Sequence, residues 1–157
     1  MYNKYNTVLN KREKSIITDL FYIGLVNKFI CTCNYETYSF GNLLDLTLLI
    51  PTDINNTNVK LDDLLNDYFK TTNSEFNTVC NYCKKICVHK KGIKINKLPD
   101  ILILSIQRID FNKKIKNNLE IQFCDSLGVD KFCDLDFKND NYIINYNLYG
   151  IINHIGI

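Results

Sequence analysis

The chain has 157 residues, 46% of them hydrophobic and 23% charged, which is enough for one ordinary hydrophobic core and short for two domains. Its 19 basic and 17 acidic residues leave a formal net charge of +2, so charge does not select nucleic acid or an anionic membrane as a partner. The sequence shows no secretory signal and no stretch as long as a membrane span, so we expect an intracellular protein, cytoplasmic or nuclear.

The first third of the chain predicts a poorly ordered start and then two strands around a turn. Residues 1–15 are polar and lack a clear period, and we expect them to be poorly ordered. Apolar positions over residues 17–29 predict a strand that enters a tight turn at residues 31–33, and residues 34–50 predict a returning strand. Residues 52–58 form a polar loop. In the returning strand, alternation puts Leu44, Leu46 and Leu48 on one face.

The middle of the chain predicts a helix, a hairpin tip and a strand. Leucines at positions 61, 64 and 65 with Tyr68 have helical spacing, so we expect a helix over residues 61–69 with acidic residues in its first turn. After a polar stretch, Cys80-Asn81-Tyr82-Cys83 places two thiols on a hairpin tip. Residues 88–95 should then form a strand that leads into Leu98-Pro99.

Residues 97–111 contain the most apolar run of the chain. Pro99 can only open a strand here, and residues 101–106 are too few for a helix core. We therefore expect a central strand buried on both faces, with the other segments as its covers.

The last part of the chain predicts two strands with an irregular segment between them. Residues 112–114 read as a turn, and Leu119, Ile121 and Phe123 alternate as in a half-buried strand. We expect residues 125–140 to be irregular. Alternation from Tyr142 to Leu148 then predicts a final strand that continues through His154.

Two close pairs of cysteines are the strongest chemical signal. Cys31 and Cys33 lie in one turn and Cys80 and Cys83 in another, which is how a four-thiolate structural zinc site is usually supplied. In a reducing compartment, seven cysteines indicate metal ligands or buried thiols rather than disulfides. The alternative is four thiols without metal, and one intervening residue in the first pair is fewer than such sites usually have.

The other polar candidates have simpler interpretations. Cys87 with His89 suggests a thiol nucleophile and its base, but no carboxylate is placed to orient the imidazole, so we interpret this pair as coincidence. His154 in an apolar stretch is interpreted as a structural histidine. The lysines at positions 84, 85, 90, 91, 94 and 97 form a solvated face, or else the basic surface of a nucleic-acid-binding zinc ribbon. Small buried hydrophobes are the expected role of Cys87, Cys124 and Cys133.

The order of these motifs resembles the ubiquitin-specific protease family of thiol deubiquitinases. The resemblance runs from about residue 17 to residue 157. It is carried, in chain order, by Cys31-x-Cys33, Leu44-x-Leu46-Thr47-Leu48, the helix with Leu-Asp-Asp-Leu-Leu, Cys80-x-x-Cys83, Lys91, Leu98-Pro99 with the apolar run to Arg108, and Tyr146-x-Leu148-Tyr149-Gly150-Ile151-Ile152-Asn153-His154-x-Gly156.

The resemblance implies an α+β fold, mostly antiparallel β, that is part of the papain-like thumb, palm and fingers architecture. Residues 16–157 would form this partial domain, with zinc-bearing fingers over about residues 27–95 and palm strands over about residues 96–157. In such enzymes the fingers and palm hold ubiquitin or a ubiquitin-like protein and direct its C-terminal tail into the active site.

The family's catalytic motifs have no match in this sequence. The nucleophilic cysteine belongs to a box upstream of the matched segment, and the general base to a Gly-His-Tyr motif beyond it, whereas His154 matches an earlier histidine of that element. We therefore expect part of a deubiquitinase, a fragment or a decayed copy, that is inactive alone. The alternatives are a non-catalytic ubiquitin-binding or scaffold module and the basic zinc ribbon.

Overall fold

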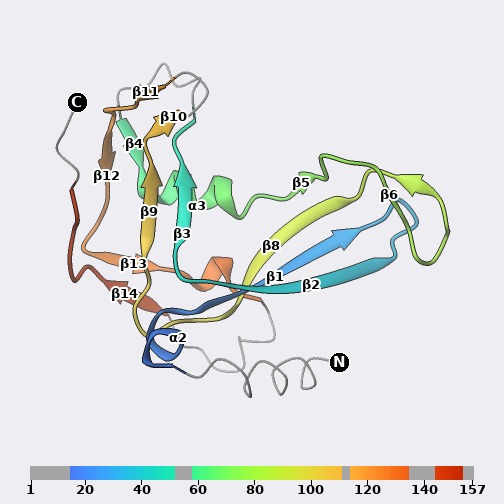
Figure 1. Cartoon of the computed structure of the whole chain (residues 1–157), viewed down its shortest axis with the longest axis horizontal. Coiled ribbons are helices and arrows are strands. Elements are labelled where there is room, and N and C mark those ends of the chain that lie inside the picture. Colours follow the sequence, from blue (N-terminus) through green and yellow to red (C-terminus); the bar gives the residue numbers. More distant parts are fainter. Residues whose placement is uncertain (1–14, 52–57, 111–113, 135–143, 154–157) are drawn as a thin grey trace.

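An extended β-sheet projects from a body of short strands and short helices (Figure 1). The computed structural model describes residues 15–51, 58–110, 114–134 and 144–153. The expectations for residues 1–14, for most of the polar loop, for Tyr142 and for His154 lie outside the described residues. No helix in the part of the chain that the structure describes is long and apolar enough to span a bilayer.

A short helix, α2 (Ile16–Phe21), precedes the first strand. The side chain of Ser15 accepts a hydrogen bond from the backbone N–H of Thr18 at 3.2 Å, and the Thr18 hydroxyl accepts one from the Ser15 N–H at 2.9 Å. This capping box fixes the helix start. The predicted strand is therefore wrong before residue 23. Its apolar signal was misleading because Ile16 and Ile17 are 75% and 54% exposed.

The extended sheet has four strands in the order β2-β1-β8-β5, all antiparallel to their neighbours. The predicted strands around the first cysteine turn and before Pro99 are confirmed as its three long members. Because β1 is in the middle, both its edges are hydrogen-bonded. The strands are β1 (Ile23–Ile30), β2 (Glu36–Leu43), β5 (Thr72–Asn73) and β8 (Lys90–Lys97).

The base of the extended sheet needs glycine at position 24. The register of β1 and β8 shifts between Gly24 and Leu25. A Cβ atom on Gly24 would lie 2.7 Å from the Lys97 Cβ and 2.5 Å from the Asn96 Oδ1. Only glycine lets the two backbones approach this closely at the irregularity.

A separate small hairpin lies at the far end of the extended sheet. Strand β6 (Thr78–Val79) pairs antiparallel with β7 (Ile86–Cys87), and Thr78 lies opposite Cys87. The turn between them contains Cys80 and Cys83, so the predicted hairpin tip is confirmed.

The body contains two pairs of parallel strands and the predicted helix. Strand β3 (Leu46–Leu49) pairs with β9 (Leu104–Gln107), and β4 (Asn58–Lys60) pairs with β12 (Glu120–Gln122). Helix α3 (Leu61–Tyr68) confirms the helix prediction and buries Leu64 and Leu65. It packs against β3, beside which it lies in Figure 1.

The returning strand is split, contrary to prediction. Strand β2 ends at Leu43, and β3 begins at Leu46 in a different sheet. Leu46 and Leu48 are fully buried, whereas Leu44 is 45% exposed. The bend between the sheets breaks the alternation, so the three leucines do not share a face.

The predicted central strand is shorter and less buried than expected. Within the apolar run of residues 101–106 the strand begins only at Leu104; it ends at Gln107, and all four of its residues are intermediate in exposure. Ile103 is 40% exposed. Among the described residues this strand pairs with β3 alone, so it lies at an edge of its sheet. The stretch is therefore not a fully buried sheet centre.

The C-terminal part has more regular secondary structure at its start, and less at its end, than predicted. Strand β13 and the 3₁₀ helix η1 lie where we expected irregular chain, and Val129 and Phe132 are buried. The final strand stops at Asn147, and Ile152 is fully exposed. These elements are β10 (Ile109–Asp110), β11 (Ile115–Lys116), β13 (Ser126–Gly128), η1 (Asp130–Phe132) and β14 (Asn145–Asn147).

One hydrophobic core joins the elements of the body. Phe69 stacks on Phe132 with ring centroids 4.7 Å apart, which ties α3 to η1. The Tyr146 hydroxyl donates to the Pro99 carbonyl at 2.5 Å, and burial raises the Tyr146 pKa to about 12. The buried members are Ile23, Leu25, Leu46, Leu48, Val59, Leu64, Leu65, Phe69, Ile95, Val129, Phe132 and Cys133.

Candidate metal centre

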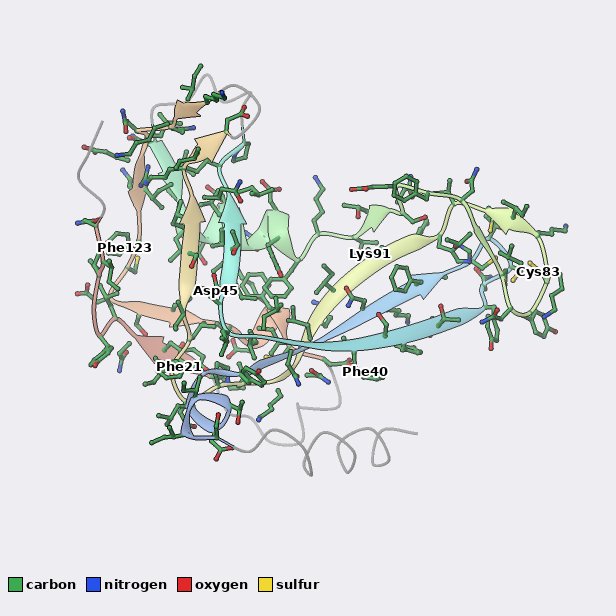
Figure 2. The ribbon with its side chains drawn as sticks, in the orientation of Figure 1. Phe21, Phe40, Asp45, Cys83, Lys91 and Phe123 are labelled. Atoms are coloured by element: carbon green, nitrogen blue, oxygen red, sulfur yellow. The ribbon has the colours of Figure 1, made fainter. Side chains whose placement is uncertain are left out.

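The two cysteine tips meet at the far end of the extended sheet. Cys31 and Cys33 follow β1, and Cys80 and Cys83 follow β6. Their four sulfur atoms all lie within 4.8 Å of one another. Figure 2 shows Cys83 at this end, remote from Phe21 and Phe123 in the body. The structure thus brings together the four predicted ligands, while the zinc ion stays a prediction.

The contacts between the tips have the spacing of a tetrahedral metal site. The Sγ atoms of Cys31 and Cys83 are 3.8 Å apart, and those of Cys33 and Cys80 are also 3.8 Å apart. A tetrahedral zinc ion with Zn–S bonds of about 2.3 Å separates its sulfur ligands by about 3.8 Å. Each contact joins one tip to the other, so the donor set fits a single zinc ion.

The first tip is closed by two backbone hydrogen bonds. The Cys31 N–H donates to the Tyr35 carbonyl at 3.0 Å, and the Asn34 N–H donates to the Cys31 carbonyl at 2.9 Å. Asn34 has a φ of 64°, a left-handed conformation that asparagine tolerates better than most residues. The tight turn points both thiols of this tip the same way.

The second tip repeats this arrangement with one residue more. The Cys80 N–H donates to the Lys85 carbonyl and the Lys84 N–H to the Cys80 carbonyl, both at 3.0 Å. Lys84, like Asn34, directly follows the second cysteine of its pair and has a positive φ, here 59°. The two tips therefore share one pattern of backbone hydrogen bonds, and the unusual one-residue spacing in the first pair reflects a loop that is one residue shorter.

The ionisation of the thiols is unequal. The pKa of Cys31 is lowered to about 5, first because the backbone N–H of Cys33 hydrogen-bonds to its sulfur, and also because the thiols of Cys87, Cys33 and Cys80 do so; burial opposes this shift. For Cys33, a backbone hydrogen bond from Tyr35 lowers the pKa, but burial and neighbouring thiols raise it to about 12. Adjacent thiolates repel each other unless a cation lies between them.

Cys87 and His89 also reach this cluster, which the sequence analysis missed. The Cys87 Sγ lies 3.4 Å from the Cys31 Sγ, and one ring nitrogen of His89 lies within 4.8 Å of both sulfurs. The sequence did contain a signal for this contact. A hairpin with its tip at residues 80–83 pairs Cys87 with Thr78, which places Cys87 close to the cysteines of the tip. Sequence spacing alone did not indicate that contact.

The remaining candidates divide between confirmed and wrong predictions. Cys133 is buried as expected, whereas Cys124 is exposed. Cys87 is only half-buried. The lysine residues 84, 85, 90, 94 and 97 are exposed and Lys91 is half-buried, as expected of a solvated face.

Comparison with known proteins identifies a family. The model described as ubiquitin carboxyl-terminal hydrolase matches residues 2–157. Ubiquitin carboxyl-terminal hydrolase 47 of Xenopus laevis is 25% identical over 145 residues, which cover 87% of this chain and 11% of that protein. Ubiquitin carboxyl-terminal hydrolase 16 of Arabidopsis thaliana is 28% identical over 155 residues, which cover 96% of this chain and 15% of that protein.

Solved structures of the same fold include the SAGA Ubp8/Sgf11/Sus1/Sgf73 DUB module bound to ubiquitin aldehyde. The match has a TM-score of 0.76 at 24% identity and covers 99% of this chain and 38% of that chain. The SAGA DUB module with a substituted Ubp8 and with Sgf11(1-72, Delta-ZnF) matches with a TM-score of 0.79 at 26% identity. This match covers 98% of this chain and 34% of that chain. These matches confirm the expected partial ubiquitin-specific protease fold.

The chain spans about a ninth to a seventh of the length of these curated relatives. The family model nevertheless matches nearly every residue of this chain. The chain belongs to the ubiquitin carboxyl-terminal hydrolase family, as a member of its ubiquitin-specific protease branch.

Proposed function

We propose that this chain is the fingers-and-palm part of a thiol deubiquitinase, that it binds ubiquitin, and that the catalytic residues lie outside it. The observation that carries the proposal is the extended sheet with paired cysteine tips, in a chain that the family model matches from residue 2 to residue 157. In this proposal the fingers lie within residues 27–95 and comprise the extended sheet, and the palm strands lie within residues 96–157.

Exposed apolar side chains support a protein partner. At the fingertip, Tyr82 is 72% exposed and Ile86 is 70% exposed; in the C-terminal segment, Tyr149 is 91% exposed. Large exposed apolar groups gathered in patches are typical of interaction surfaces. Solved structures of this fold were determined bound to ubiquitin aldehyde and to monoubiquitin. Ubiquitin is therefore the partner that we propose.

A structural zinc ion completes the proposal. Cys31, Cys33, Cys80 and Cys83 would hold it as a closed set of four thiolates, and the ion would supply folding energy rather than reaction chemistry. It would join the β1–β2 turn to the β6–β7 turn. The fingertip hairpin has only two residues in each strand, too few for independent stability.

The surroundings of His89 do not suit a catalytic histidine, which favours catalytic residues that lie outside this chain. A thiol protease needs an imidazole that is oriented by a third group, commonly a carboxylate or amide. The His89 Nδ1 lies 2.8 Å from the Thr78 hydroxyl, and among the described residues its ring is hydrogen-bonded to no carboxylate. His89 is also 94% buried at the fingertip, which leaves its ring little access to a substrate.

The purified chain is therefore expected to bind ubiquitin without cleaving it. Fluorescence anisotropy with labelled ubiquitin should give saturable binding that changes little with salt, unlike binding to nucleic acid. Tyr82→Ala should weaken this binding roughly tenfold or more, because exposed aromatic side chains often dominate interfaces. Ile16→Ala, at a position that is 75% exposed on α2, is the control and should leave the affinity unchanged.

Two results would contradict this proposal. A fluorogenic ubiquitin C-terminal amide should not be turned over, and turnover above that of Cys87→Ala would refute the assignment of the catalytic residues. Absence of saturable ubiquitin binding by the folded chain would refute the ubiquitin-holding role.

A further inference from the structure

A second group of metal-ligating side chains overlaps the four-thiolate cluster. Cys31, Cys87 and His89 have ligand atoms that all lie within 4.8 Å of one another. Cys31 is common to both groups, and its Sγ is closer to that of Cys87, at 3.4 Å, than to that of Cys83, at 3.8 Å. The fingertip therefore offers five thiols and one imidazole, two donors more than a tetrahedral ion takes.

His89 has the environment of a metal ligand. Its side chain is 6% exposed, and its Nδ1 lies 2.8 Å from the Thr78 Oγ1. The backbone of His89 is held as well, since its N–H donates to the Ser74 hydroxyl at 3.0 Å and its carbonyl accepts from the Ser74 N–H at 2.7 Å. A hydrogen bond at one ring nitrogen that fixes the orientation of the other is the usual support of a ligating histidine.

Room for a further ligand adjoins this imidazole. A cavity of about 220 Å³ is lined by His89, Cys80 and Thr78, and also by Phe29, Tyr35, Thr37, Val79 and Asn81. This volume accommodates water molecules beside polar groups. Cys31 and Cys87 are not among the residues that line this cavity, so it adjoins the site on the side of His89. Three protein ligands with water in the fourth position are a complete coordination shell for zinc.

The four thiols of the set differ in burial. Cys33 is exposed, whereas Cys31 and Cys80 are 3% and 2% exposed. It also belongs to the shorter of the two loops, whose frame closes at Asn34. Loss of Cys33 from the ion would leave the shared Cys31 next to Cys87 and His89.

We propose that Cys87 and His89 are two further metal ligands, which together with Cys31 form an open site that holds a zinc-like divalent ion when the four-thiolate set is incomplete. This inference rests on the metal-binding part of the proposed function. In the intact chain the closed set holds the ion because four thiolates bind it more tightly than two thiolates and an imidazole.

Metal titration of designed variants tests this inference. The background variant Cys33→Ser/Cys83→Ser removes the more exposed thiol of each tip and keeps the two buried ones. Titration with Co²⁺ under anaerobic conditions, followed by its thiolate charge-transfer absorption and then by Zn²⁺ displacement, should give about one ion per chain. Adding Cys87→Ser or His89→Gln should reduce this to less than about a tenth of an ion at the same metal concentration, whereas adding Cys124→Ser, an exposed thiol outside both groups, should change nothing.

Each outcome decides the question. Cys31→Ser alone should lose both sites, because this residue is common to them. If the background variant binds no ion, or binds it equally with and without Cys87, the inference is overturned. Binding of an ion by the unaltered chain would then still support the four-thiolate site. If the unaltered chain binds no ion, both fail. Should the background variant not fold, the single variant Cys33→Ser serves instead, and its Co²⁺ affinity must fall roughly tenfold or more when Cys87→Ser is added.

Discussion

Cys31→Ser, which removes a thiol common to both groups of ligands, is expected to release the zinc ion and to unfold the fingertip locally while the body stays folded. Cys31 is 3% exposed, and its sulfur lies 3.8 Å from that of Cys83 on the other tip. In small zinc-bound fingers, the metal contributes on the order of 10 kcal/mol of binding free energy that is also folding energy. Amide hydrogen exchange over residues 78–87 should therefore accelerate by roughly 100-fold or more.

The matched control for this variant is Cys133→Ser. Cys133 is also buried, at 5% exposure, but it belongs to the hydrophobic core of the body and not to the thiol cluster. This variant should keep the metal and the slow exchange of the fingertip, and lose stability in the body instead. Equal fingertip exchange in the Cys31→Ser and unaltered chains would contradict a metal ion that joins the two tips.

Leu48→Ala is expected to destabilise the body by about 2–5 kcal/mol, as truncation of a buried leucine does. Leu48 is fully buried in β3, where it packs in the core between α3 and the strands of the body. Leu49→Ala on the same strand is the control, because Leu49 is 63% exposed. This change should stay within about 0.5 kcal/mol. Urea unfolding followed by far-ultraviolet circular dichroism gives both free energies, and similar losses for the two variants would mean that β3 does not face the core as described.

Local patterns were sufficient where one short segment determines its own structure. The helix over residues 61–68 was predictable because its apolar spacing and acidic first turn agree. The two cysteine tips were predictable for a similar reason, since each is a compact turn with thiols at fixed spacing. Their meeting in space was predictable only as a consequence of zinc chemistry, which requires four ligands at one point.

Long-range pairing was beyond the reach of the same patterns. The apolar run over residues 101–106 indicated burial on both faces, but Leu104–Gln107 pairs with a single strand among the described residues. The bend after Leu43 depends on two sheets that meet there, which no alternation of leucines encodes. Val129 and Phe132 are also buried, but the charged residues Asp130 and Lys131 lie between them in the sequence and gave the segment no apolar alternation.

Contacts between side chains from different strands were the least predictable part of the site. Cys87 and His89 are two residues apart, a spacing that would face them the same way on one strand and so suggested a local pair, but it gave no partner. Their partner, Cys31, lies 56 residues earlier than Cys87. Only the pairing of β1 with β8 and of β6 with β7 brings these residues together.

The central claim is that two turns far apart in the sequence meet at one zinc ion. X-ray absorption spectroscopy at the zinc edge of the purified chain, combined with elemental analysis, tests it most directly. The account predicts about one zinc per chain with four sulfur neighbours at about 2.3 Å. Absence of zinc, or a coordination shell made mainly of nitrogen and oxygen, would contradict it.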